Sequence, residues 1–248
     1  MKRTFGILAV SLAVAGIATL ATPHSTWAAY KVTDVANGGT ISGKVLLGSA
    51  KKESKSYTIS KDPDACGTGN REVPFVRANG PALRDAVVYL LKVKEGKAFE
   101  SGLKKTTINQ EKCQFMPYLS VMENGGVLEA INSDSVLHNI HTYELIGRAR
   151  RTVMNVSQPE KGNIVTKKVK LRKGAGMKVE CDAHDFMHAF VFVAKNPYYA
   201  VVDDKGQFEI KGVPEGKYKI NSWHGVLGDQ KGTVTVTAGG TVNVDFSY

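Results

Sequence analysis

Residues 177–193 read MKVECDAHDFMHAFVFV, in which a polar segment separates the alternating residues Met177-Lys178-Val179 from the apolar run Ala189–Val193. Alternating and continuously apolar runs of this length are both typical of strands. The polar segment carries Cys181, His184 and Met187 in the spacing Cys-x-x-His-x-x-Met. The stretch therefore predicts two strands joined by a loop. This loop presents a thiolate, an imidazole and a thioether, all of which can bind copper.

On both sides of this loop, the sequence pattern after residue 28 predicts short strands. They are bounded by turn residues such as Pro214-Glu215-Gly216 and Gly239-Gly240. Many short strands at close spacing indicate an all-β sandwich or barrel. The expected strands are Thr40–Leu47, Ala86–Lys92, Gly126–Asn132, Thr166–Arg172, Met177–Cys181, Phe190–Ala194, Phe208–Lys211, Lys217–Ser222, Gly232–Thr237 and Thr241–Phe246.

Two segments depart from this pattern. Residues 49–80 are polar and rich in Lys, Ser, Asp and Gly, which predicts a long loop. Residues 94–105 are compatible with one or two helical turns, and no run has a helical period over a dozen residues.

A fourth metal-binding side chain comes from an upstream segment, LHNIH at residues 137–141, where His138 lies 43 residues before Cys181. One thiolate, two imidazoles and a weak axial thioether suit both oxidation states of copper. We therefore expect one type 1 copper ion held by His138, Cys181, His184 and Met187. Asn139 is not expected to bind the metal. It is expected to form a hydrogen bond to the backbone of the ligand loop.

Three other histidines compete less well for the metal. In extended backbone, His141 points to the face opposite His138, and His188 points away from Met187. Whether His141 or His188 joins the site stays open, and His224 is expected to be structural. Zinc is a weaker alternative to copper, because structural zinc sites do not use methionine as a ligand. Covalently attached haem is not expected, because the sequence has no Cys-x-x-Cys-His motif.

The N-terminal residues predict export. Two basic residues at positions 2 and 3 precede an uncharged apolar run over 6–20, and small residues lie before a cut after Ala28. The apolar run is shorter than the roughly 20 residues needed to span a bilayer. We expect a cleaved signal peptide over residues 1–28, no later membrane span, and a periplasmic or secreted protein.

The odd cysteine count needs an explanation in an oxidising compartment. Cys66, Cys113 and Cys181 are an odd number, so pairing two and using the third as a metal thiolate accounts for all three. We expect the disulfide Cys66–Cys113, which would also pin the loop over residues 49–80.

The chain is basic, with a formal net charge of +10. This charge favours a redox partner protein that is acidic where it docks. A solvated basic face is the alternative interpretation. Nucleic acid is not expected as a partner, because the basic residues are dispersed among the strands.

The loop over residues 181–187 resembles the ligand loop of the cupredoxins, the blue copper proteins, in its short amicyanin type. Residues 137–141 resemble the first-ligand segment of plastocyanin-like and amicyanin-like members. The resemblance covers about residues 115–195, departs at Asp185 and His188, and implies a Greek-key β-sandwich. It also implies that Met187 is the axial ligand.

The flanking segments resemble a different module. Residues 39–45, 86–90 and 198–224 look like a carboxypeptidase regulatory-like domain, a small transthyretin-like sandwich without catalysis. Bacterial exported proteins labelled methylamine utilisation join both features. The resemblance implies a cupredoxin unit over residues 107–196, inserted in or fused to a sandwich split over residues 29–106 and 197–248. A single enlarged sandwich is the alternative.

These expectations favour one-electron transfer, with a partner docking where His184 emerges, and no enzymatic activity. A copper carrier or delivery protein is a second hypothesis, for which His141, His188 and Met116 would be extra donors. A third hypothesis is an extracellular β-sandwich binding module without metal.

Overall fold

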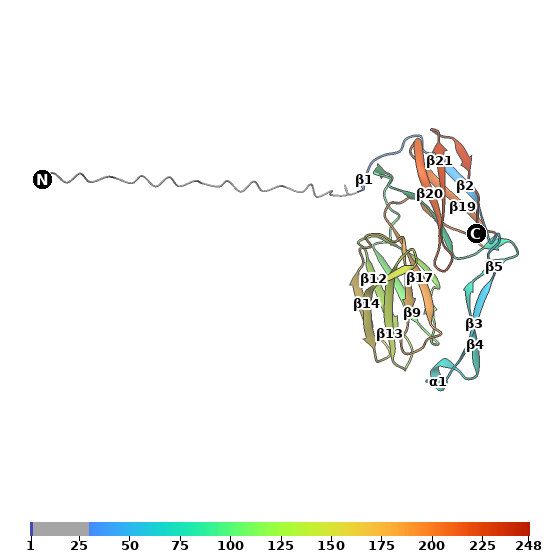
Figure 1. The fold of residues 1–248 in the computed structure, drawn as a ribbon, viewed down its shortest axis with the longest axis vertical. Coiled ribbons are helices and arrows are strands. Elements are labelled where there is room, and N and C mark those ends of the chain that lie inside the picture. Colours follow the sequence, from blue (N-terminus) through green and yellow to red (C-terminus); the bar gives the residue numbers. More distant parts are fainter. Residues whose placement is uncertain (2–29) are drawn as a thin grey trace.

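The computed structural model describes Met1 and residues 30–248, so the cleavage expected after Ala28 falls outside the described residues. The described elements are almost all strands, and they build two β-sandwiches and one long hairpin (Figure 1). This arrangement confirms the all-β fold class. No helix in the described part of the chain is long and apolar enough to cross a membrane.

The first sandwich is built from the middle of the chain. One sheet has the order β10-β9-β12-β15 and the other β11-β17-β16-β13-β14, so the chain passes repeatedly between the two sheets. Buried aliphatic side chains such as Ile108, Leu128, Ile140 and Val191 fill the space between them. The strands are β9 Lys105–Gln110, β10 Phe115–Met116, β11 Leu119–Glu123, β12 Val127–Asn132, β13 His138–Ile146, β14 Ala149–Gln158, β15 Ile164–Lys168, β16 Gly176–Glu180 and β17 His188–Ala194.

The second sandwich is built from the segments on either side of the first. One sheet has the order β18-β7-β20-β21, and the other has β19-β2-β6-β5 with β22 and β23 also paired to β2. Its own core includes Ile41, Leu90, Ile210 and Ile220. The strands are β2 Gly39–Leu46, β5 Ala78–Asn79, β6 Ala82–Leu83, β7 Ala86–Leu91, β18 Tyr199–Val201, β19 Gln207–Val213, β20 Gly216–His224, β21 Gly228–Val236, β22 Thr241–Asn243 and β23 Phe246–Ser247, and a short parallel pair joins β1 Lys31–Val32 to β8 Glu95–Gly96.

Strand β17 joins the two sandwiches because both of its faces are buried. Successive side chains of a strand point to opposite faces. Ala189, Val191 and Val193 lie in the first core, whereas Phe190 and Phe192 lie in a separate cluster with Val87 and Trp223 of the second sandwich. This double burial explains why the run after the ligand loop is apolar at every position.

Trp223 is the centre of this contact between the sandwiches. Its ring centroid lies 5.7 Å from that of Phe192 and 6.4 Å from that of Phe190. Gly176 on β16 makes room for the indole, since a Cβ there would lie 2.4 Å from the Trp223 ring.

The loop expected over residues 49–80 is instead a hairpin, and that prediction was wrong. Strands β3 Glu53–Thr58 and β4 Asn70–Val76 pair antiparallel, and a short helix, α1 Pro63–Cys66, lies at the tip. Of the β3 side chains only Tyr57 is buried, so the strand has no apolar alternation. In Figure 1 the hairpin extends from the second sandwich alongside the first, and Tyr57, Cys66 and Val73 join the first core.

Three further expectations differ from the structure. The strand expected over Thr241–Phe246 is divided into β22 Thr241–Asn243 and β23 Phe246–Ser247. Residues 94–105 contain β8 and turns rather than helix. The strand expected over Thr166–Arg172 ends at Lys168, although Val169 and Leu171 remain buried beyond it.

Candidate metal centre

The three expected nitrogen and sulfur ligands meet at one end of the first sandwich. His138 begins β13, and Cys181 and His184 lie on the loop between β16 and β17. Strands β13 and β16 are antiparallel neighbours with His141 opposite Glu180, so the start of β13 lies beside the ligand loop. All three side chains are buried, at 0–2 % exposure.

The three donor atoms surround a common point. The Nδ1 atoms of His138 and His184 lie 3.1 Å apart, and each lies 3.9 Å from the Cys181 Sγ. The point equidistant from the corners of this triangle is about 2.1 Å from each, which is the length of a metal–nitrogen bond and slightly short for a metal–sulfur bond. The donor spacing therefore matches a trigonal His₂Cys metal site.

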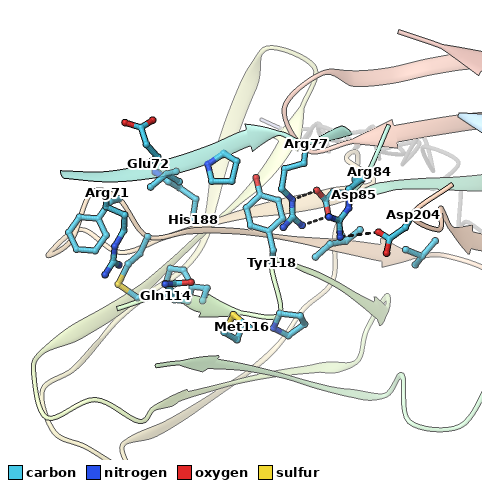
Figure 2. Close-up of a pocket in the computed structure, with 18 of the residues that line it drawn as sticks. Arg71, Glu72, Arg77, Arg84, Asp85, Gln114, Met116, Tyr118, His188 and Asp204 are labelled. Atoms are coloured by element: carbon cyan, nitrogen blue, oxygen red, sulfur yellow. Dashed lines mark hydrogen bonds and ion pairs between the residues drawn. The ribbon is translucent and has the colours of Figure 1, made fainter. Parts of the chain in front are cut away.

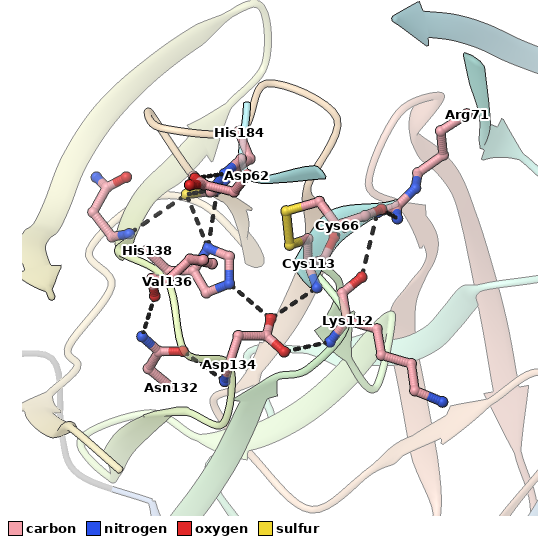
Figure 3. Close-up of a disulfide and its surroundings, with 12 residues drawn as sticks. Asp62, Cys66, Arg71, Lys112, Cys113, Asn132, Asp134, Val136, His138 and His184 are labelled. Atoms are coloured by element: carbon pink, nitrogen blue, oxygen red, sulfur yellow. Dashed lines mark hydrogen bonds and ion pairs between the residues drawn. A yellow bond between two sulfur atoms is a disulfide. The ribbon is translucent and has the colours of Figure 1, made fainter. Parts of the chain in front are cut away.

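Each imidazole is oriented by a carboxylate at its other nitrogen. The Nε2 of His138 lies 2.8 Å from Asp134, and the Nε2 of His184 lies 2.9 Å from Asp62 (Figure 3). When Nε2–H donates to a carboxylate, Nδ1 keeps its lone pair. Two lone pairs 3.1 Å apart repel each other unless a cation or a proton lies between them. Burial also lowers the pKa of His138, which favours the neutral ring that a metal requires.

Asp134 is itself held by two backbone amides. The N–H groups of Lys112 and Cys113 donate to its carboxylate over 2.7 and 2.8 Å. Both residues have left-handed backbone, with φ of 53°, so that successive N–H groups form a concave anion site. Burial opposes ionisation, but the two amides and His138 bring the pKa of Asp134 below its usual value. The carboxylate therefore stays ionised and keeps His138 in one orientation.

Asn139 connects the first ligand segment to the ligand loop, as expected for this residue. Its backbone N–H lies 3.4 Å from the Cys181 Sγ, and its side-chain oxygen accepts the N–H of Asp182 at 2.5 Å. Burial raises the pKa of the Cys181 thiol, while the amides of Asn139, His184 and Ala183 lower it. The surroundings thus supply hydrogen bonds to a thiolate, although burial still raises the pKa of the thiol overall.

Met187 lies on the same turn. Its N–H donates to the carbonyl of His184 over 3.0 Å, and its side chain is 1 % exposed within the core cluster that contains Cys181. Its role as the axial ligand stays a prediction.

The other histidines of residues 30–248 lie outside the donor triangle. His141 contacts Asp182 at 3.0 Å and the hydroxyl of Tyr143 at 2.8 Å. His188 contacts the hydroxyl of Tyr57 at 3.2 Å, and burial lowers its pKa to about 4. His224 is buried in the second sandwich.

Cys66 and Cys113 form a disulfide, which is the expected pair, and Cys181 is the free cysteine. The disulfide sulfurs and a ring nitrogen of His184 lie within 4.8 Å of one another. Figure 3 shows the disulfide beside the two histidines, between the segments that carry Asp62 and Asp134.

His184 does not emerge at the surface, so its expected exposure was wrong. The place where a partner docks stays a prediction. The tip of the β3–β4 hairpin covers its ring, and the side chain is 1 % exposed. Asp62 makes this contact from 122 positions earlier in the chain. Neither Asp62 nor Asp134 was found by sequence reasoning. Asp134 lies four residues before His138, a local signal that was available, but nothing local pointed to Asp62.

A pocket of about 600 Å³ lies next to the ligand loop, between β4 and the two sandwiches (Figure 2). Met116, Tyr118 and His188 line it, and Met116 is half exposed. Two of its arginines are paired with aspartates, Arg77 with Asp85 and Arg84 with Asp204. The pocket therefore offers little uncompensated charge to a ligand.

No curated protein matches the chain. A family model described as polysaccharide lyase family 4, domain II matches residues 182–244, which is about a quarter of the chain. This description differs from the carboxypeptidase regulatory-like module that the flanking segments resembled. The match begins inside the ligand loop and spans β17 and much of the second sandwich.

Several solved structures resemble part of the chain. A purple cupredoxin from Nitrosopumilus maritimus has 18 % identity and a TM-score of 0.31, covering 36 % of this chain and 99 % of its own. The oxidised P96G mutant of amicyanin has 18 % identity and a TM-score of 0.30, covering 39 % and 89 %. A copper-containing nitrite reductase from Thermus scotoductus has 16 % identity and a TM-score of 0.30, covering 42 % of this chain and 25 % of its own. The chain is thus similar in part to copper proteins, at values that establish no family membership.

Proposed function

We propose that this chain binds one type 1 copper ion and carries single electrons between redox partners. The observation that supports this most is the buried His138–Cys181–His184 triangle, in which both Nδ1 lone pairs face the same point as the sulfur. A copper ion bound there would supply an electron carrier that alternates between two oxidation states.

The residues of this chain would perform three tasks around the ion. His138, Cys181 and His184 would bind it, and Met187 would be a weaker fourth ligand. Asp134 and Asp62 would keep each imidazole in the tautomer that leaves Nδ1 free. The burial of all three donors would exclude water and keep the ligand geometry similar in both oxidation states, so that little rearrangement accompanies electron transfer.

The donor set favours copper over zinc. A structural zinc site is normally completed by a fourth cysteine, histidine or carboxylate. The candidate fourth ligand here is the thioether of Met187, and trigonal His₂Cys sites with a distant methionine are typical of blue copper.

We further propose an exported protein with a redox partner protein and no catalytic activity of its own. A disulfide beside the site is consistent with an oxidising compartment. Without residues 1–28, which contain two basic residues and no acidic one, 31 basic against 23 acidic residues give a net charge of +8, which favours a partner with an acidic face. For the domain organisation, we propose a cupredoxin unit over residues 107–196 inserted in a second β-sandwich that is split over residues 29–106 and 197–248.

The test is an absorption spectrum of the Cu(II)-loaded protein lacking residues 1–28. We expect an intense visible thiolate-to-copper band that Cys181→Ala and His138→Ala each abolish. His141→Ala is the matched control, because His141 lies outside the triangle. The visible thiolate-to-copper band should persist in this variant. A wild-type protein without such a band would refute the proposal. A protein that binds Cu(I) tightly but has no reversible redox wave would support the copper carrier instead.

A further inference from the structure

The tip of the β3–β4 hairpin, residues 59–69, contacts the candidate metal centre directly. Asp62 directly precedes α1 and has left-handed backbone, with φ of 49° and ψ of 51°, but its side chain makes no capping hydrogen bond to the helix. Its Oδ2 lies 2.9 Å from the Nε2 of His184. The His184 side chain retains 1 % exposure, so this edge of the ring is closed to solvent.

Two further contacts hold the hairpin tip in place. The disulfide attaches Cys66, the last residue of α1, to Cys113 of the first sandwich. Arg71 donates to the carbonyl of Cys113 at 2.9 Å and also to that of Cys66, so it bridges the same two segments. Its guanidinium lies 4.7 Å from the ring centre of Phe186 on the ligand loop.

The disulfide also connects the supports of the two imidazoles. On one side, the N–H of Cys66 donates to the carbonyl of Asp62 over 2.8 Å. On the other side, the N–H of Cys113 donates to Asp134 over 2.8 Å. A single covalent bond therefore couples the carboxylate that orients His184 to the carboxylate that orients His138.

We propose that residues 59–69 form a lid over the metal centre, locked by the Cys66–Cys113 disulfide, and that Asp62 is the positioning residue for His184. The lid admits or releases the metal ion when the disulfide is open and retains it when the disulfide is closed. This inference rests on the proposed function, because it assigns the same site a controlled entry.

The opening step is a thiol–disulfide exchange with a dithiol reductant. The Cys66–Cys113 bond breaks, both sulfurs become thiols, and the two thiols of the reductant become a disulfide. Two electrons and two protons pass from the reductant to the lid cysteines. Closing is the reverse reaction with a disulfide oxidant.

The first experiment uses the metal-free protein, so that it does not depend on copper. Cys181 is the free thiol of the described chain and is 2 % exposed. We expect iodoacetamide to alkylate Cys181 at least tenfold faster in Cys66→Ser/Cys113→Ser than in the wild type. Asp64→Ala is the matched control, because Asp64 is an exposed residue of α1 for which no contact to the site is seen. Equal rates in the wild type and the double variant would overturn the lid.

Wild-type protein treated with a mild dithiol gives a second route to the open state, should the double variant fail to fold. Alkylation is then followed by peptide mapping, because three thiols are present. Protection of Cys181 after the disulfide is reduced would again overturn the proposal.

The second experiment tests Asp62 by nitrogen NMR of the metal-free imidazoles. We expect His184 to be the Nε2–H tautomer in the wild type and a tautomer mixture in Asp62→Ala. Asp62→Asn should restore the wild-type spectrum, since an amide oxygen still accepts this hydrogen bond. An unchanged His184 signal in Asp62→Ala would refute the positioning role. If both experiments succeed and no copper band forms, the lid stands and the proposed function fails.

Discussion

Acid should destabilise the second sandwich through His224, which is 1 % exposed at the end of β20. Its Nδ1 accepts the N–H groups of Val226 and Leu227 at 3.2 Å each. A proton on Nδ1 would break both hydrogen bonds and bury a charge. Burial accordingly lowers the pKa of His224 from 6.5 to about 4.

The sign of the effect follows from proton uptake in the two states. Below pH 6.5 the unfolded chain binds a proton at this position, whereas the folded protein binds it only below about pH 4. The stabilisation is therefore complete above pH 6.5 and is lost as the pH falls from 6.5 to 4. At 1.36 kcal/mol per pKa unit, the loss amounts to about 3 kcal/mol.

Urea unfolding of the metal-free protein at several values between pH 7 and pH 4.5 measures this loss. His188 also has a depressed pKa, so the informative quantity is the difference between wild type and His224→Gln. We expect this difference in unfolding free energy to shrink by about 2–3 kcal/mol towards the acid end. A difference that stays constant over the pH range would refute the assignment.

Three further predictions follow from buried contacts. Glu144→Gln should cost about 2–3 kcal/mol in urea unfolding, because the buried carboxylate accepts three backbone N–H groups and an ion pair from Arg151; a loss under 0.5 kcal/mol would contradict this. Trp223→Ala should cost about 3–5 kcal/mol and split calorimetric unfolding into two transitions, since Trp223 packs between the sandwiches; a single unshifted transition would refute that role. Met187→Gln should retain copper while lowering the reduction potential measured by voltammetry, and an unchanged potential would argue against axial ligation.

The sandwich strands could be predicted from sequence because burial imposes a local pattern. Strand β2 alternates between buried and less buried positions along its length, and it was expected within one residue at each end. Strand β17 is continuously apolar after His188 because it contacts two cores. The meeting of His138, Cys181 and His184 could also be expected from sequence, since the last two of them lie on one short loop.

The hairpin and its contacts could not be predicted in the same way. Strand β3 is exposed at every position except Tyr57, so it resembles a polar loop in sequence. It is held by its pairing with β4 and by contacts at the hairpin tip. The contact between Asp62 and His184 joins residues 122 positions apart, and no local spacing encodes such a pair. The burial of His184 depends on this contact and was missed for the same reason.

X-ray absorption at the copper edge of the loaded protein tests the central claim most directly. The donor triangle of His138, Cys181 and His184 predicts one sulfur and two nitrogen scatterers at about 2.0–2.3 Å. Cys181→Ser should remove the sulfur contribution. A spectrum fitted by oxygen and nitrogen alone in the wild-type protein would contradict the account.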